Sequence, residues 1–309
     1  MTRTDVASRA AVGDREMNRR SLLVSGAALA ALTLPREGEG SDRRMLELRL
    51  RKRVRRPDDR YEVRTETAAW RPDQSAVVVC DMWDAHWCKG ATSRVIEVAP
   101  RMNAFLKACR DKGLLIIHSP SSCMAAYVEH PARRRAQDAP KAVDLPAQIG
   151  EWCRQIPAEE KGTYPIDQAD GGCDCVPTCP GGNPWRRQIA ALDIREEDAI
   201  SDSGSEIWNL LAARGTTNVM VLGVHTNMCV LGRPFGLRNL SRYGKNAVLV
   251  RDLTDTMYNS RSWPYVNHFR GTDLIVEHIE KFVCPTISSD QILGGRAFRF
   301  AADPLARIK

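Results

Sequence analysis

The stretch from Asn218 to Gly236, NVMVLGVHTNMCVLGRPFG, constrains both the fold and the chemistry of this 309-residue chain. It predicts a buried strand over Val219–Leu222, a tight turn, and a helix that begins at or near Cys229. A cysteine in that position lies at the carboxyl edge of a sheet and at the amino end of a helix. Backbone N–H groups and the helix dipole there favour a thiolate and can hold an oxyanion. Cys229 is therefore the first candidate for a reactive residue.

Apolar runs elsewhere predict a parallel sheet with helices on both faces. Strands are expected at 75–81, 114–118, 198–201, 219–222, 246–250 and 286–288, and helices at 94–112, 205–214 and 272–282. This alternation indicates an α/β fold, a three-layer α/β/α sandwich with a mainly parallel, doubly wound sheet. Ligands of such sheets bind beyond the carboxyl ends of the strands. Asp81, His118, Cys229 and Asp252 stand at expected strand ends, so we expect the active site there.

The positive charge of the chain belongs to its N-terminal part. The net charge is +7, and residues 1–65 carry 16 Lys/Arg against 10 Asp/Glu, which leaves the remainder close to neutral. A nucleic-acid surface on the folded body is therefore not expected. We expect residues 36–69 to form a basic arm or linker, either solvated or strapped across the body, and residues 70–309 to form one domain.

The first 35 residues resemble an export signal. Arg19 and Arg20 precede an apolar run that ends near Ala31, with small residues at Ala28–Ala30 for cleavage. The run is too short and too weakly apolar to span a membrane. A twin-arginine signal and a periplasmic or extracytoplasmic location are predicted, with no stable membrane span after its removal. Met17 is an alternative start, and a basic tail followed by a chance apolar helix is the alternative interpretation.

Two motifs together resemble a known family. The apolar strand 77–80 ends in Asp81-Met82, and more than a hundred residues later comes Gly-x-x-Thr-x-x-Cys-Val, formed by Gly223, Thr226, Cys229 and Val230. The pair is similar to the isochorismatase-like cysteine hydrolases, which include nicotinamidases, carbamoyl amidohydrolases and isochorismatases. The resemblance covers residues 70–289.

The resemblance implies an Asp–Lys–Cys catalytic set, with Cys229 as nucleophile and Asp81 as general base. It also implies a cis peptide bond at Val224–His225 and an oxyanion hole made by the backbone N–H groups of His225 and Cys229. The implied reaction cleaves a C–N bond of a small amide through an acyl-enzyme. Two alternatives are a vinyl-ether hydrolase of the same family and a non-catalytic binding or redox protein on the same fold.

The lysine of that set has no counterpart at its expected place. Residues 198–206, after the third strand, contain no lysine. Lys161 is the nearest upstream candidate, with an ordinary surface lysine as the alternative reading. Arg187 can supply a positive charge but cannot readily exchange a proton.

The segment after Asp81, Trp-Asp-Ala-His-Trp, supplies candidates for the substrate pocket. Trp83, His86 and His118 are predicted to contact substrate. Asp84 and His86 are weak candidates for a metal site, because the Asp/His pattern that the family's nicotinamidases carry after the second strand is absent here. No cofactor is therefore required, although a divalent metal such as zinc stays open. The expected partner is a small-molecule substrate, and homo-oligomer formation is open.

Ten cysteines are many for a domain that can build a full core. Cys80 and Cys109 lie in apolar contexts and are expected as buried free thiols. Cys173, Cys175 and Cys179 lie within a long irregular segment expected at 123–190. They form a weak signal for a zinc or calcium loop, because a fourth ligand is lacking nearby. A disulfide-tied lid over the active site is the alternative.

Overall fold

The computed structural model describes residues 45–307. Every described residue belongs to one compact unit of the chain. The predicted export signal lies outside the described residues. Within the described part, no helix combines the length and apolar character that a membrane crossing needs.

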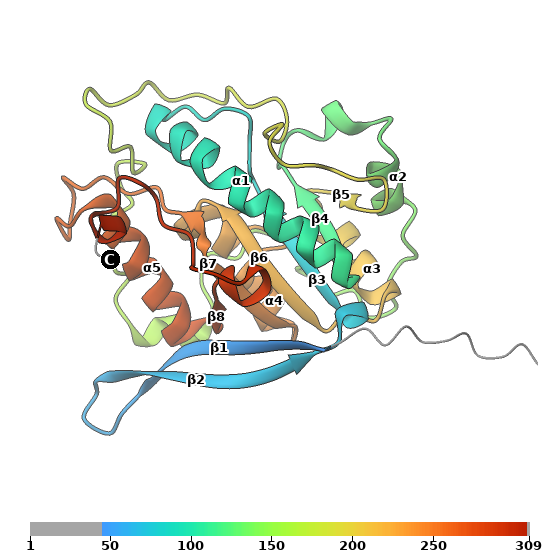
Figure 1. The fold of residues 1–309 in the computed structure, drawn as a ribbon, viewed down its shortest axis with the longest axis horizontal. Helices are drawn as coiled ribbons and strands as arrows, with labels where there is room; N and C mark the ends of the chain where they lie inside the picture. Colours follow the sequence, from blue (N-terminus) through green and yellow to red (C-terminus); the bar gives the residue numbers. More distant parts are fainter. Residues whose placement is uncertain (1–44, 308–309) are drawn as a thin grey trace, which may run out of the picture. The chain divides into compact units, whose positions relative to one another are not determined.

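The centre of the structure is an eight-stranded sheet with the order β2-β1-β8-β7-β6-β3-β4-β5 (Figure 1). The strands from β8 to β5 run parallel, whereas β1 is antiparallel to both β2 and β8. This confirms the predicted α/β fold with a mainly parallel sheet. The strands are β1 Leu46–Arg55, β2 Tyr61–Trp70, β3 Ser75–Cys80, β4 Leu115–Ser119, β5 Ala199–Ile200, β6 Asn218–Val224, β7 Asn246–Asp255 and β8 Thr286–Ile287.

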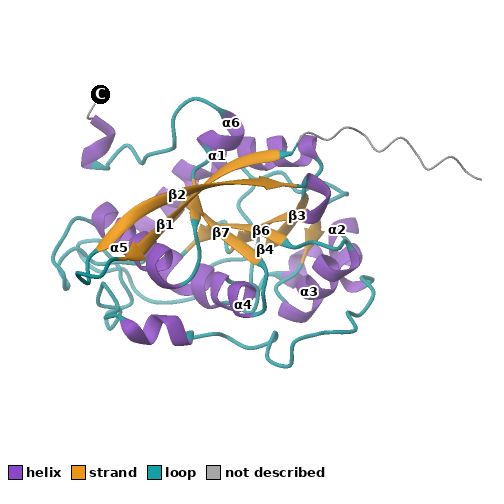
Figure 2. Ribbon diagram, turned by 90° about the horizontal axis from the view of Figure 1, so that it is seen from below, coloured by secondary structure: helices purple, strands orange, loops and turns teal. Residues whose placement is uncertain are grey.

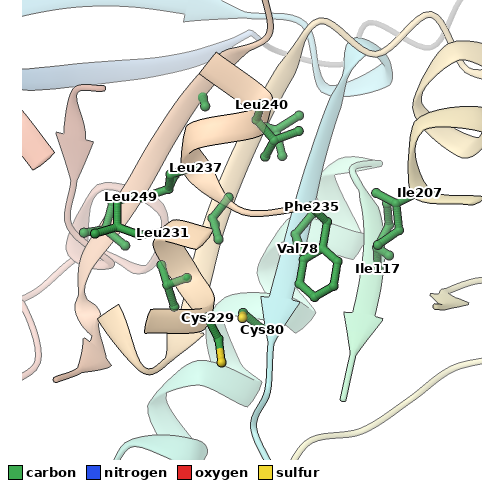
Figure 3. Close-up of a cluster of buried hydrophobic side chains, with 14 of the residues drawn as sticks. Val78, Cys80, Ile117, Ile207, Cys229, Leu231, Phe235, Leu237, Leu240 and Leu249 are labelled. Atoms are coloured by element: carbon green, nitrogen blue, oxygen red, sulfur yellow. The ribbon is translucent and has the colours of Figure 1, made fainter. Parts of the chain in front are cut away.

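Helices cover both faces of this sheet, as the sequence predicts (Figure 2). The helices are α1 Lys89–Lys112, α2 Pro131–Gln137, α3 Gly204–Ala213, α4 Leu237–Arg242, α5 His268–Phe282 and α6 Asp290–Leu293. Alternate residues of β3 point to opposite faces. Val77 and Val79 belong to the cluster that contains the apolar side of α1, and Val78 belongs to the cluster with α3, α4 and α5. Figure 3 shows the second cluster, with Cys80 and Cys229 at one end of it.

The path of the chain places a switch point between β3 and β6. From β3 the chain moves outward through β4 to β5, and it then returns to lay β6 on the other side of β3. Cys80 and Gly223 are partners in the register of this pair. Gly223 has φ 108°, and a Cβ there would lie 2.0 Å from the carbonyl oxygen of Cys80. Only glycine therefore allows the two strands to end so close together.

Two expectations for the strands of the sheet are wrong. The described part of residues 36–69 is not a solvated arm or linker but the β1–β2 hairpin, which extends the sheet beyond β8. The buried carboxylate of Glu280 accepts hydrogen bonds from Arg51 (2.6 Å) and Arg53 (3.2 Å), so these arginines are structural. β7 continues to Asp255 instead of ending at residue 250. Asp252 therefore lies within the strand, where it accepts hydrogen bonds from Ser289.

A buried ion pair fastens the irregular segment to the helical layer. The carboxylate of Glu159 accepts hydrogen bonds from Arg238 in α4 (2.8 and 2.7 Å) and contacts His278 in α5 (2.8 Å). Burial alone would raise the pKa of Glu159. The hydrogen bonds from His278 and Arg238, with the arginine charge, outweigh burial and lower that pKa from 4.5 to about 2. The pair therefore helps to fix residues 153–162 against the domain.

We predict that Glu159→Ala destabilises the chain by about 3–5 kcal/mol at neutral pH, because it leaves the Arg238 charge buried and unpaired. The lowered pKa gives a stabilisation present above the ordinary glutamate pKa of 4.5 and lost as the pH falls toward 2. Urea denaturation of the wild type and of Glu159→Ala across that pH range measures the difference in their free energies of unfolding. Glu160→Ala, at the exposed neighbouring position, is the matched control. Equal free energies of unfolding for the two variants would contradict the role of the pair.

Candidate active site

Three charged or polar side chains meet at the switch point. The Cys229 thiol lies near the carboxylate of Asp81 and the guanidinium of Arg233, and both charges act on its pKa. Arg233 Nε lies 3.2 Å from Asp81 Oδ2, and the backbone N–H of Ser121 donates to Asp81 Oδ1 at 2.7 Å. Asp81 is fully buried and Cys229 nearly so. The structure therefore brings together the predicted nucleophile and base, and it adds a cation.

Asp81 takes its place through an unusual backbone conformation. It follows β3 directly and has φ 47°, a left-handed value that costs a non-glycine residue about 1–3 kcal/mol. Its N–H donates to Ser119 O at 3.1 Å, and its carbonyl accepts from Trp83 N at 2.8 Å. These bonds hold the carboxylate at the end of the strand, beside Cys229.

Cys229 lies in a turn of five residues, Thr226–Val230, which has π-helical hydrogen bonding. Asn227 fixes this turn to the end of β7, because its side chain donates to Met257 O and accepts from Met257 N, both at 3.0 Å. The Val224–His225 peptide bond before the turn is cis, as the resemblance implies. The helix expected at or near Cys229 is therefore present but short: it covers this turn and residues 231–232, and the next regular helix is α4, so the thiol lies within the turn and not at the start of a long helix.

The surroundings of Cys229 favour the thiol over the expected thiolate. Burial raises the pKa of Cys229 well above its ordinary value of 9.0, and the charge of Asp81 raises it further, whereas Arg233 opposes both. Burial also raises the pKa of Asp81, against the effects of Arg233, Cys229 and Ser121. A protonated thiol thus faces a carboxylate of increased basicity. Such a pair can transfer its proton when the sulfur attacks a substrate.

Arg233 supplies a positive charge near Cys229, for which the resemblance implies a lysine. It follows Cys229 by four residues, and its backbone N–H donates to the backbone carbonyl of Cys229 at 3.0 Å. Both residues therefore belong to one helical turn. Its guanidinium also lies 5.3 Å from the centre of the Trp152 ring. The sequence carried this signal as the spacing Cys-x-x-x-Arg. The resemblance implies the cation upstream of the cysteine, so this spacing was not predicted to matter.

Neither cation proposed from the sequence is among the charges that act on Cys229. Lys161 is exposed at the end of a 3-10 helix, Pro157–Lys161, and lines a cavity together with Tyr61 and Cys284. The carbonyl of Arg187 accepts a hydrogen bond from Asp84 N at 2.9 Å, within a loop. Arg233 therefore replaces both as the candidate partner of Cys229.

Stacked aromatic rings, here called the aromatic wall, lie beside the turn Thr226–Val230 that contains Cys229. Trp83 stacks on Trp185 with ring centres 4.4 Å apart, and His86 stacks on Trp185 at 5.8 Å. The His86 ring meets the His225 ring edge-to-face at 4.8 Å. Burial and Arg94 lower the pKa of His86 to about 4, and burial and His86 lower that of His225 to about 3. Both rings are therefore neutral at physiological pH.

His118 and Asp84 have structural roles that sequence reasoning did not foresee. The buried His118 ring contacts Gln188 Oε1 (3.0 Å) and Asp198 Oδ2 (3.1 Å), which uses both ring nitrogens. Asp84 Oδ1 accepts from Arg186 N at 3.0 Å, and His86 Nδ1 accepts from Cys88 N at 3.1 Å. The structure thus gives no support to substrate contact by His118 or to a metal held by Asp84 and His86.

Asp255 is a further residue of the site that the sequence did not indicate. It ends β7, is fully buried, and accepts hydrogen bonds from Arg94 (2.7 Å) and His268 (2.9 Å). The charges of Arg94 and His268 outweigh burial and lower the pKa of Asp255. It was missed because the strand was expected to end earlier. Within residues 45–307, Arg94 Nη2 and His225 Nε2 are buried without a hydrogen-bond partner.

Comparisons with known proteins give similarity to solved structures alone. No protein-family model matches the chain, and no curated protein sequence matches it. A cysteine hydrolase from Pseudomonas syringae pv. phaseolicola is 16% identical, with a TM-score of 0.44 over 72% of this chain and 92% of that one. An N-carbamoylsarcosine amidase from Thermoplasma acidophilum is 11% identical, with a TM-score of 0.37 over 70% and 97%.

A third similar structure is a pyrazinamidase of Pyrococcus horikoshii in complex with zinc, 17% identical, with a TM-score of 0.38 over 70% of this chain and 99% of that one. The similar structures also include proteins described as isochorismatase-family proteins. TM-scores below 0.5 are too low to support a conclusion about function. The function proposed below therefore rests on the residues of this site.

The arrangement predicts opposite effects of the two charged neighbours on the Cys229 thiol. Asp81→Asn removes a negative charge and should lower the pKa of Cys229, whereas Arg233→Gln should raise it, each by about one pH unit or more. The pH at half-maximal alkylation by iodoacetamide, followed by peptide mass spectrometry, measures both shifts. Cys109, buried in α1, serves as the internal reference in every digest. Shifts in the same direction would show that the charges do not act on this sulfur.

Proposed function

We propose that this chain is a cysteine hydrolase of the isochorismatase-like type, which cleaves a C–N bond of a small amide through an acyl-enzyme on Cys229. One observation carries the proposal: the buried carboxylate of Asp81 is paired with the guanidinium of Arg233 at 3.2 Å, and both charges act on the Cys229 thiol. A nucleophile, a base and a fixed positive charge are the groups that this reaction needs.

In the first half-reaction, Cys229 Sγ attacks the carbonyl carbon of the substrate while Asp81 takes the S–H proton. The oxyanion that forms accepts hydrogen bonds from the backbone N–H groups of Cys229 and His225, the hole that the resemblance implies. Asp81 then gives its proton to the nitrogen as the C–N bond breaks. The products of this half-reaction are a free amine or ammonia and a thioester on Cys229.

In the second half-reaction, Asp81 takes a proton from water as the water oxygen attacks the thioester carbon. The C–S bond breaks, the acid leaves, and the proton returns to the sulfur. Asp81 alone moves protons in both halves, because an arginine stays charged at every relevant pH. Arg233 contributes a fixed charge that stabilises the thiolate as it develops.

The neutral aromatic wall indicates which class of substrate the site favours. Trp83, Trp185 and the uncharged His86 present flat rings beside Cys229's turn. Rings of this kind favour a small planar molecule that stacks on them. Nicotinamide-like and carbamoyl or ureido compounds meet this description.

One observation favours a vinyl-ether hydrolase as the second candidate. Burial raises the pKa of Asp81, and a carboxyl group of raised pKa is suited to protonate a vinyl ether. That chemistry does not require a covalent bond to Cys229.

We predict that Cys229→Ala lowers amide hydrolysis at least about 1000-fold, because the acyl-enzyme cannot form. Purified wild type and variant are assayed against nicotinamide, carbamoyl and ureido compounds. Mass spectrometry of quenched wild type should show the acyl group on the peptide that contains Cys229. Cys109→Ala is the control for loss of a buried thiol. Full activity of Cys229→Ala would exclude the covalent route and, with a vinyl-ether substrate, favour the second candidate.

We also propose that residues 1–35 direct export by the twin-arginine route, on the support of Arg19, Arg20 and the short apolar run. Fused to a reporter protein, the segment should carry the reporter out of the cytoplasm. Replacing both arginines by lysine should block that export. Export unaffected by the replacement would contradict the assignment of the route.

A further inference from the structure

A second group of reactive side chains lies outside the active site. The sulfur atoms of Cys88, Cys173, Cys175 and Cys179 all lie within 4.8 Å of one another. Three of these residues form the Cys-x-Cys-x-x-x-Cys motif of the irregular segment, and Cys88 is the residue before α1. In Figure 1, the yellow-green loop of the motif passes the amino end of this helix. The fourth ligand that the sequence seemed to lack is therefore supplied by Cys88, 87 residues before Cys175.

The spacing of the sulfurs fits four ligands around one ion. Zinc binds thiolate sulfur at about 2.3 Å in a tetrahedron, which places the sulfurs about 3.8 Å apart. Cys88 Sγ and Cys175 Sγ are 3.8 Å apart. A disulfide needs its sulfurs at about 2.0 Å, and all four cysteines are free in this structure. The sulfurs form one compact group and not two bonded pairs.

The first turn of α1 supplies hydrogen bonds to this group. Lys89 N donates to Cys179 Sγ at 3.4 Å, and Gly90 N donates to Cys175 Sγ at 3.3 Å. N–H groups at the amino end of this 24-residue helix would otherwise lack partners, and they stabilise negative charge on sulfur. Donors to ligand sulfur are the usual surroundings of a metal–thiolate centre.

The shell around the sulfurs limits the access of water. Cys88 and Cys173 are buried, and they pack with Ala91 and Met257, with Trp87 and Met228 against them. The loop lies close to the end of β7: Gly172 has φ 73°, and a Cβ there would lie 2.3 Å from Met257 O. Four thiolates in such surroundings would repel one another without a cation among them.

The neighbouring carboxylates are used for other contacts. Asp174 Oδ1 accepts from Ser260 N and Oγ at 2.9 and 2.6 Å. Asp170 Oδ2 accepts from Asn259 at 2.7 Å and from Ser262 at 2.8 Å. The donor set is therefore four sulfurs, which selects a soft ion such as zinc and disfavours calcium. Four protein ligands leave no open position, so the role is structural.

We propose that Cys88, Cys173, Cys175 and Cys179 bind one zinc ion, which fastens the loop of residues 171–179 to the start of α1. The ion also helps to position a residue near the active site, although it does not contact that site. The N–H of Cys88 donates to His86 Nδ1 at 3.1 Å, and His86 stands against His225 in the aromatic wall. The zinc site thereby fixes the position of a wall residue without touching the reacting atoms.

The full-length chain, purified under reducing conditions, should contain one zinc per chain by elemental mass spectrometry. A thiol-specific mercurial should release that zinc into a chromogenic chelator. After exchange, Co²⁺ should give the visible absorption and sulfur-to-metal charge transfer of a tetrahedral four-thiolate centre. These measurements use the wild type, so they do not depend on a variant that folds.

Cys179→Ser should reduce the bound zinc to near zero, and Cys109→Ser, which alters a buried thiol of α1 outside the group, should leave it at one per chain. Cys229→Ala should also keep its zinc, so failure of the hydrolase proposal is distinguishable from failure of this one. A chain without metal, iron in place of zinc, or a mass showing two disulfides among these four cysteines would overturn the proposal.

Discussion

The close approach of β3 and β6 is the contact on which the site depends. Gly223 lets the end of β6 lie against the carbonyl of Cys80, and the two strands then release Asp81 and the Cys229 turn at the same edge. A side chain at position 223 would have to separate these strands, and the thiol would move away from its base. The same packing stabilises the unfavourable left-handed backbone conformation of Asp81, because both strands are buried on both faces.

A fixed positive charge next to a buried acid and thiol changes how the proton can move. A lysine at this place could exchange protons with the cysteine, whereas Arg233 cannot. The buried carboxylate must then serve as the single proton carrier, and burial gives it the raised pKa which that task requires. The guanidinium also contacts Trp152, so its position is set by an aromatic ring and by the carboxylate together.

The sequence predicted the elements that depend on short-range pattern. Apolar runs revealed the central strands, and the two motifs led to Asp81, Cys229 and the cis bond at Val224–His225. Pattern could not reveal what depends on contacts between distant segments. The arginine-rich sequence of the β1–β2 hairpin was interpreted as a charged arm. The sequence pattern does not reveal that these arginines pair with Glu280, more than 220 residues away. His118 was predicted to contact substrate, whereas both nitrogens of its ring contact Gln188 and Asp198.

The four-cysteine group shows the same limit and links the fold to the predicted route of export. A site of four reduced sulfurs is best filled in a reducing compartment, because an oxidising one converts neighbouring thiols to disulfides. The twin-arginine route carries proteins that are already folded, so a metal bound in the cytoplasm would travel with the chain. Its four ligands would then be protected from oxidation by the ion and by the apolar shell of Met257 and Trp87. Export in the folded state and a thiolate metal site in one chain are thus physically compatible, whereas export of an unfolded chain would expose these cysteines to pairing.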